Sequence, residues 1–132
     1  SVWTSAAMIN LYERIYLAIM QIPAGNVSSY GDIATIGGNG CDARIVGDAL
    51  ADLSAKRALL LPWQRVVNRE GAISTRGLQQ RDVLEAEGVA FDTQGRVVMQ
   101  RHRWKGPHAD WAEAHGFQML PNREDAEQLS LF

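Results

Sequence analysis

The sequence predicts a mainly α-helical domain with short β hairpins, a winged-helix-like fold that contains a helix-turn-helix. Apolar residues recur at helical spacing in the first half of the chain, and a glycine-rich turn separates two short helical segments. In the second half, short β-prone runs flank glycine-containing turns. With 132 residues, 46% of them hydrophobic, the chain is long enough to bury one core without disulfides.

Two helices are predicted before the glycine-rich turn. Over residues 9–22, apolar side chains recur three and four positions apart, and the Pro-Ala-Gly sequence at 23–25 ends this helix. Ser29, followed by Asp32, resembles a capping box with Asp in place of the usual Glu, and it begins a second, short helix. The Gly-Gly-Asn-Gly sequence at 37–40 predicts the turn that ends it.

A third helix and two hairpins are predicted after this turn. Asp42 is a candidate N-cap for the third helix, and Gly47 within it indicates close packing of the backbone. Residues 66–73 predict two short strands around a glycine turn, which would form a small wing. Residues 79–87 return to helical spacing, and residues 91–99 predict a second hairpin.

Charge divides the chain near Pro107. Residues 1–106 carry 12 Lys and Arg against 10 Asp and Glu, a net charge of +2, whereas residues 107–132 carry one Arg against five acids, a net charge of −4. We therefore predict a domain over residues 1–106, followed by an acidic, partly ordered or flexible tail over 107–132. The domain is only weakly basic, so its bulk charge neither establishes nor excludes binding to nucleic acid.

The remaining composition argues against a membrane protein, a disulfide scaffold and a metal site. No run approaches the roughly 18 apolar residues of a membrane span, and no signal segment opens the chain, so a cytoplasmic protein is expected. Cys41 is the single cysteine, and we expect an inert small residue rather than a nucleophile. His102, His108 and His115 do not form a metal-binding spacing with it, and no cofactor is implied.

Three sequence blocks carry the functional signal: Ser29-Tyr30-Gly31-Asp32-Ile33-Ala34, Ala43-Arg44-Ile45-Val46-Gly47 and Pro62-Trp63-Gln64-Arg65-Val66-Val67. In order and approximate spacing they resemble the hallmark blocks of the DNA-binding domain of the O6-alkylguanine-DNA alkyltransferases. The resemblance covers about residues 9–104 and implies the winged-helix-like fold of the alkyltransferase C-terminal type. In that family the third block is Pro-Cys-His-Arg-Val, and its cysteine accepts the alkyl group.

Two residues of this third block differ from the family's catalytic pair. Trp63 stands in place of the cysteine, and an indole cannot replace a thiolate as nucleophile. Gln64 stands in place of the histidine and cannot relay a proton near neutral pH. Glu87 matches the family's glutamate, and we expect it to keep only a structural hydrogen bond. The chain thus resembles the alkyltransferase-like proteins, which bind lesions without reversing them, so we predict that it is not an enzyme.

This resemblance implies a partner and a set of roles. The partner would be double-stranded DNA that contains O6-alkylguanine. Arg44 would enter the minor groove and fill the gap left by a flipped nucleotide, while Tyr30 rotates its 3′ phosphate. Arg76 would stack on the flipped base. The lesion pocket would consist of Trp63, Arg76, Tyr30, Gln64 and Val66. The DNA-binding residues would be Tyr30, Ala43, Arg44 and Gly47.

Two departures from the family pattern limit what can be transferred. Alkyltransferase-like proteins usually carry Pro-Trp-His-Arg, so Gln64 changes one residue of the pocket. The segment from Arg44 to Trp63 is also about two residues longer than the family pattern, so no contacts are carried over for the connection at residues 52–56.

The last five residues resemble the pentapeptide with which bacterial replication and repair proteins bind the sliding clamp. The alternative is that these apolar residues pack back on the domain or match by chance. The clamp hypothesis would place the protein in the bacterial cytosol or nucleoid. Its candidate residues are Gln128, Leu129, Leu131 and Phe132.

The sequence therefore favours a monomeric, non-enzymatic protein that marks O6-alkylguanine for repair, by family analogy for the nucleotide excision repair proteins. One alternative is a residual DNA repair enzyme, either an alkyl acceptor or a base hydrolase that uses Glu87 and a water. Another is a winged-helix regulator of undamaged sequences. Arg44 is nearly alone as a basic residue of the expected recognition helix, which argues against the regulator.

Overall fold

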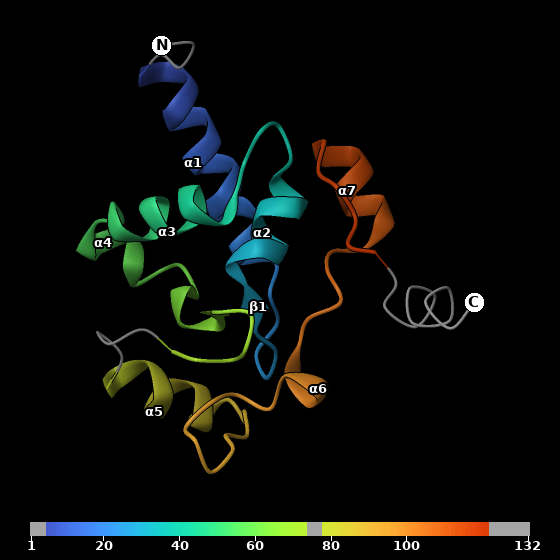
Figure 1. The fold of residues 1–132 in the computed structure, drawn as a ribbon. Helices are drawn as coiled ribbons and strands as arrows, with labels where there is room; N and C mark the ends of the chain where they lie inside the picture. Colours follow the sequence, from blue (N-terminus) through green and yellow to red (C-terminus); the bar gives the residue numbers. More distant parts are fainter. Residues whose placement is uncertain (1–4, 74–77, 122–132) are drawn as a thin grey trace.

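A computed structural model describes residues 5–73 and 78–121 of the chain. Figure 1 shows α1, α2 and α3 lying together, with α5 below this group and α7 to its right. The elements are, in chain order, α1 (Ser5–Met20), β1 (Ser28–Ser29), α2 (Tyr30–Gly37), α3 (Ala43–Ala51), α4 (Ala55–Ala58), the 3-10 turn η1 (Trp63–Arg65), β2 (Val66–Val67), α5 (Leu78–Ala86), α6 (Met99–His102) and α7 (Ala109–His115). No helix within this described part is long and apolar enough to cross a membrane.

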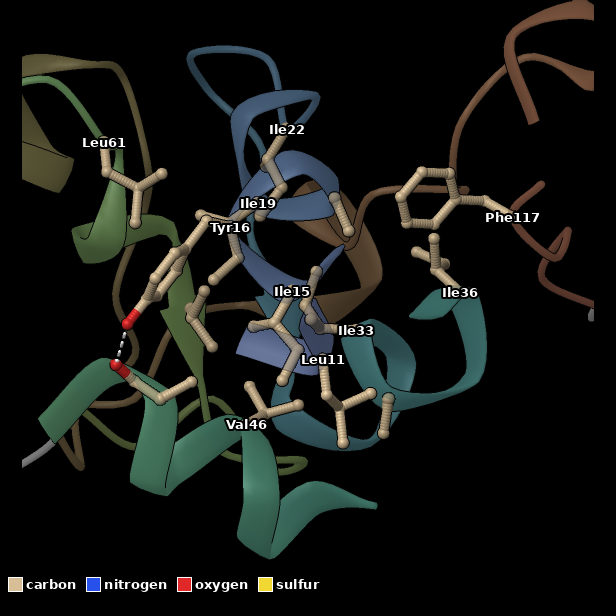
Figure 2. Close-up of a cluster of buried hydrophobic side chains, with 14 of the residues drawn as sticks. Leu11, Ile15, Tyr16, Ile19, Ile22, Ile33, Ile36, Val46, Leu61 and Phe117 are labelled. Carbon is tan, nitrogen blue, oxygen red and sulfur yellow. Dashed lines mark hydrogen bonds between the residues drawn. The ribbon is translucent and has the colours of Figure 1, made fainter. Parts of the chain in front are cut away.

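The main core lies between the first three helices, as the mainly helical prediction requires. Helix α1 begins before the predicted range 9–22 and ends two residues earlier, but Ile22 stays buried. Figure 2 shows the apolar side chains of α1 packed against those of α2 and α3. The hydroxyl of Tyr16 donates to the carbonyl oxygen of Ala49 at 2.6 Å, so the polar end of this buried ring also ties α1 to α3.

Both predicted N-caps of the helix-turn-helix are confirmed. The Ser29 hydroxyl accepts from the backbone N–H of Asp32 at 3.0 Å, and the Asp42 carboxylate accepts from that of Ile45 at 2.8 Å. Asp32 does not complete a capping box, because its carboxylate accepts from Arg103 Nε and Nη2 at 2.7 and 2.6 Å. This ion pair joins α2 to the segment that follows α6. In the turn between α2 and α3, Asn39 has a φ of 55°.

The predicted hairpin over 66–73 is wrong. The two residues of β2 pair in parallel with β1, so that Ser28 lies opposite Val66. Directly after β2, Asn68 forms a tight turn in which its side-chain oxygen accepts from the backbone N–H groups of Glu70 and Ala72, at 2.9 and 2.7 Å. The chain thus turns before a second strand can form. The predicted hairpin over 91–99 is present only as a turn with one antiparallel bridge, between Phe91 and Val97.

The packed part of the chain extends beyond the predicted domain end at residue 106. Helix α7 ends at His115 and is followed by Gly116, which adopts the left-handed conformation with a φ of 72°, and Phe117 is buried next to it. Arg14 donates to the carbonyl oxygens of Gly37 and Gly116, both at 2.7 Å, and lies over the Phe117 ring. The acidic composition of residues 107–132 gave no indication that Gly116 and Phe117 pack near the end of α2. The candidate clamp motif at 128–132 lies outside the described residues.

Candidate nucleic-acid interface

Trp63 lies at a cavity of about 350 Å³ between the helix-turn-helix and α5. Three of the predicted pocket residues meet there: Tyr30 from the start of α2, Trp63 from η1 and Val66 from β2. Gly47 brings the predicted recognition helix to the same cavity. The described residues that line it are Tyr30, Gly47, Leu50, Ala51, Leu53, Ala58, Trp63, Val66 and Gln80.

Of the two remaining predicted pocket residues, Gln64 is not among the described residues of this wall, and Arg76 lies outside the described residues. Gln64 is directed elsewhere, since its amide nitrogen donates to a carboxylate oxygen of Glu87 at 3.4 Å. The described residues of the cavity wall come from α2, α3, α4, η1, β2 and α5, and from Leu53 between α3 and α4. The three sequence blocks therefore supply only part of the wall.

The turn that presents Trp63 is held from behind by Arg65. Its Nη1 donates to the carbonyl oxygen of Ile22 at 2.7 Å, and its Nε donates to the two carboxylate oxygens of Glu87 at 3.2 and 3.1 Å. A further bond from Nη2 makes this a bidentate ion pair in a mostly buried position. The expectation that Glu87 keeps a structural hydrogen bond is confirmed. Both of its oxygens are committed to fixing η1.

The N-terminal turn of α3 is open to solvent. Ala43 and Arg44 are exposed, and the small Ala43 side chain leaves the helix start accessible. The close packing expected at Gly47 is wrong, because a Cβ placed there would meet no atom within 4 Å. Gly47 instead borders the cavity, so its missing side chain leaves space beside Trp63.

Replacing Gly47 by Ala should raise the free energy of unfolding by about 0.5–1 kcal/mol, because Ala loses less backbone entropy inside a helix and meets no clash here. If a DNA backbone needs the space at Gly47, the same variant should bind DNA more weakly. Urea unfolding and a DNA titration measure the two effects. A loss of stability in Gly47→Ala would contradict the open position.

Tyr30 and Cys41 are both protonated at neutral pH. Burial raises the pKa of the Tyr30 hydroxyl above its usual value of 10.0, so the pocket wall carries a neutral O–H group. Burial, and then the charge of Asp42, raise the pKa of the Cys41 thiol from 9.0 to about 11, against a smaller opposing effect of Arg14. The thiol lies in the turn between α2 and α3, beside Gly37, and its pKa is shifted in the direction opposite to that of an activated nucleophile.

We expect Cys41 in the folded protein to react with iodoacetamide at pH 8 about 100-fold more slowly than an ordinary cysteine. The reason is that a pKa of about 11 instead of 9.0 lowers the thiolate fraction by that factor. Mass spectrometry at timed intervals measures the rate, and the same chain unfolded in urea is the control. Equal rates in the folded and unfolded states would contradict the raised pKa.

The histidine that the structure buries has a structural role. His102 Nδ1 donates to the carbonyl oxygen of Gly25 at 3.0 Å, and its Nε2 accepts from the backbone N–H of Ala90 at 2.9 Å. Both ring nitrogens are thus used to connect loops. Within residues 5–73 and 78–121, no three His, Cys, Asp or Glu side chains gather as metal ligands would.

Comparison with known proteins identifies the family. The model of the 6-O-methylguanine DNA methyltransferase DNA-binding domain matches residues 10–89. The chain belongs to this family. A DNA base-flipping protein of Escherichia coli (strain K12) is 42% identical over 95 residues, which are 70% of this chain and 72% of that protein. Alkyltransferase-like protein 1 of Schizosaccharomyces pombe is 41% identical over 87 residues, 62% of this chain and 79% of that one.

A solved structure supports the fold. S. pombe Atl1, in complex with damaged DNA containing O6-carboxymethylguanine, matches with a TM-score of 0.61 and 36% identity, covering 74% of this chain and 96% of that chain. The predicted resemblance to alkyltransferase-like proteins and the mainly helical, DNA-binding fold are thereby confirmed.

Sequence reasoning missed one polar residue of the cavity. Gln80 is buried in the first turn of α5 and lines the cavity together with residues of the recognition helix. A signal was present, because Gln80 precedes Val83 and Leu84 by three and four positions and so lies on the same side of the helix. The last of the three sequence blocks ends at Val67, so the family pattern gave Gln80 no role.

Proposed function

We propose that the chain binds double-stranded DNA, turns an O6-alkylated guanine out of the helix, and holds it in the cavity at Trp63 without transferring the alkyl group. The observation that carries the proposal is the placement of Trp63 and Tyr30 on one cavity with Gly47 of the recognition helix. Membership of the methyltransferase DNA-binding family supports it, and so does the likeness to a relative solved with damaged DNA.

The chemistry of the cavity favours binding over reaction. None of the described lining residues carries a thiol or an amine that could accept an alkyl group. Gln64 cannot act as a base, and Glu87 is engaged by Arg65. These contacts also argue against a hydrolase in which Glu87 activates a water. We expect no increase in protein mass after incubation with alkylated DNA, and an increase of one alkyl group would refute the non-enzymatic assignment.

The exposed start of α3 is suited to the minor groove. Turning a base out costs a few kcal/mol, and Arg44 would offset part of it by filling the gap in the base stack. Tyr30 would move the phosphate next to the flipped base, and Arg76 would stack against that base. Stacking contributes about 1–3 kcal/mol per base. Little sequence preference follows, because the minor groove hardly distinguishes base pairs within the A·T and G·C classes.

Arg44→Ala should lose the preference for a duplex with O6-methylguanine over the matched guanine duplex. We expect wild-type protein to bind the lesion duplex more tightly, and Arg44→Ala to weaken this binding about fivefold or more, since a contact of this kind contributes about 1–3 kcal/mol. Fluorescence anisotropy at fixed salt measures both affinities. Arg101→Ala, an exposed arginine on α6, is the matched control and should keep the preference.

The comparison of wild-type affinities for the lesion duplex and the guanine duplex tests lesion binding directly. Equal affinity for lesion and guanine would refute lesion binding and favour a winged-helix regulator of undamaged DNA. A preference that survives Arg44→Ala would keep lesion binding but remove Arg44 from the role of filling the gap.

We further propose that the bound protein marks the lesion for the nucleotide excision repair proteins, and that Gln128, Leu129, Leu131 and Phe132 bind the bacterial sliding clamp. Family analogy supports the first proposal, and the terminal sequence supports the second. Deletion of residues 128–132 should abolish a pull-down with the clamp and leave lesion affinity unchanged. A pull-down that survives the deletion would refute clamp binding.

A further inference from the structure

Gln80 is a polar side chain that is 3% exposed and lines the cavity. Its Nε2 donates to the carbonyl oxygen of Gln64 at 2.9 Å and to that of Val66 at 3.0 Å. These carbonyls lie on either side of Arg65, one in the middle of η1 and one at the start of β2. Both amide hydrogens of Gln80 are thereby used, and the two bonds fix which end of the carboxamide is nitrogen.

The carboxamide oxygen of Gln80 is left for a ligand. No described group donates to Oε1, whereas every fully buried side-chain oxygen or nitrogen in the described residues has a partner. Oε1 is therefore not a fully buried atom without a partner, and the Gln80 side chain to which it belongs lines the cavity at Trp63, where a ligand could reach this oxygen. Tyr30 and Trp63 bring an O–H and an N–H donor to the same wall, so Gln80 supplies the carboxamide acceptor.

An O6-alkylated guanine offers one kind of donor to such an acceptor. Alkylation at O6 removes the proton from N1, and the exocyclic 2-amino group remains as the donor of the base. We propose that Gln80 Oε1 accepts a hydrogen bond from this 2-amino group when the base occupies the cavity. The inference rests on the proposed function and adds a residue that determines specificity to it.

Two properties of the base would then be recognised separately. The apolar wall, which includes Leu50 and Leu53, would accommodate the alkyl group. Gln80 would recognise that the base is a guanine, because hypoxanthine-type bases lack the 2-amino group. A purely structural Gln80, which only ties α5 to η1, would affect binding of all these bases alike. The two roles therefore predict different ratios between the affinities for a base with the 2-amino group and a base without it.

The test compares duplexes that contain O6-methylguanine or O6-methylhypoxanthine, which differ only in the 2-amino group. Affinities of wild type and Gln80→Lys are measured by anisotropy. A lysine amine can still donate to the carbonyls of Gln64 and Val66 but cannot accept. We expect wild type to prefer the 2-amino base about two- to tenfold more than the variant does, which corresponds to the net contribution of one hydrogen bond.

Taking the ratio between protein variants cancels any difference in how easily the two duplexes open. Gln79→Met, an exposed neighbour on α5, is the matched control and should keep the wild-type ratio. Gln80→Met replaces the lysine variant if that variant fails to fold in a thermal unfolding scan. A ratio that is the same in wild type and in the Gln80 variants would overturn the inference, as would a wild type indifferent to the 2-amino group.

Failure of this inference differs from failure of the proposed function. A wild type that does not distinguish O6-methylguanine from guanine refutes lesion binding itself. A wild type that distinguishes them, but whose ratio does not change with Gln80, keeps lesion binding and removes only the role of Gln80.

Discussion

Arg65→Met is expected to lower the free energy of unfolding by about 3–5 kcal/mol, because it leaves the Glu87 carboxylate without its positively charged partner in a mostly buried position. The two side chains are 17% and 14% exposed, so water compensates little of the loss. The bond from Arg65 to the carbonyl oxygen of Ile22 is lost as well. Urea unfolding followed by circular dichroism measures the change.

Two further variants separate the buried charge from the loss of one side chain. Arg65→Met combined with Glu87→Met should recover much of the stability, since a buried ion pair replaced by apolar residues is often close to neutral. Arg81→Met removes an exposed pair with Glu85, 44% and 50% exposed, and should cost no more than about 1 kcal/mol. A cost for Arg65→Met equal to that for Arg81→Met would contradict the buried ion pair.

The same variant also tests the site. Arg65 and Glu87 hold the turn that presents Trp63, so freeing the turn should weaken the preference for O6-methylguanine. We expect Arg65→Met to lose selectivity even at a temperature where it remains folded. An unchanged preference would show that Trp63 is positioned without this ion pair.

Gly71→Ala is the second large effect, with an expected loss of about 2–5 kcal/mol of unfolding free energy. A Cβ at Gly71 would lie 2.4 Å from the carbonyl oxygen of Val97 and 3.2 Å from Cγ of Met99, and the backbone φ is 90°. Left-handed strain and overpacking each cost about 1–3 kcal/mol. The neighbouring backbone cannot easily move, because Val97 donates its N–H to the carbonyl oxygen of Gly71 at 2.9 Å.

Gly88→Ala is the matched control for this prediction. Gly88 has nearly the same φ, 91°, but a Cβ there would meet no atom within 4 Å. Gly88→Ala should therefore lower the free energy of unfolding only by the backbone strain, about 1–3 kcal/mol. The difference between the two alanine variants in urea isolates the clash with Val97. Equal losses would show that the loop at Val97 yields without cost.

Local hydrogen bonds are the part of the fold that the sequence predicted well. Ser29 and Asp42 each cap a helix through a bond to a residue three positions later, so a short stretch of sequence contains the whole interaction. The wing was predicted wrongly, because β2 is only two residues long and pairs with β1, 38 positions away. The fate of Asp32 was equally distant, since its partner Arg103 is 71 positions along the chain.

For the candidate site, the sequence by itself determined the family and indicated Tyr30, Arg44 and Trp63 as candidate site residues. This was possible because a motif is a local pattern. Only the tertiary structure decided that Gly47 faces open space rather than packed backbone. It also decided that Gln80 lines the cavity and that its amide nitrogen is bound to the carbonyl oxygen of Gln64 in the Trp63 turn. Burial and the direction of a polar group depend on segments that meet only when the chain folds.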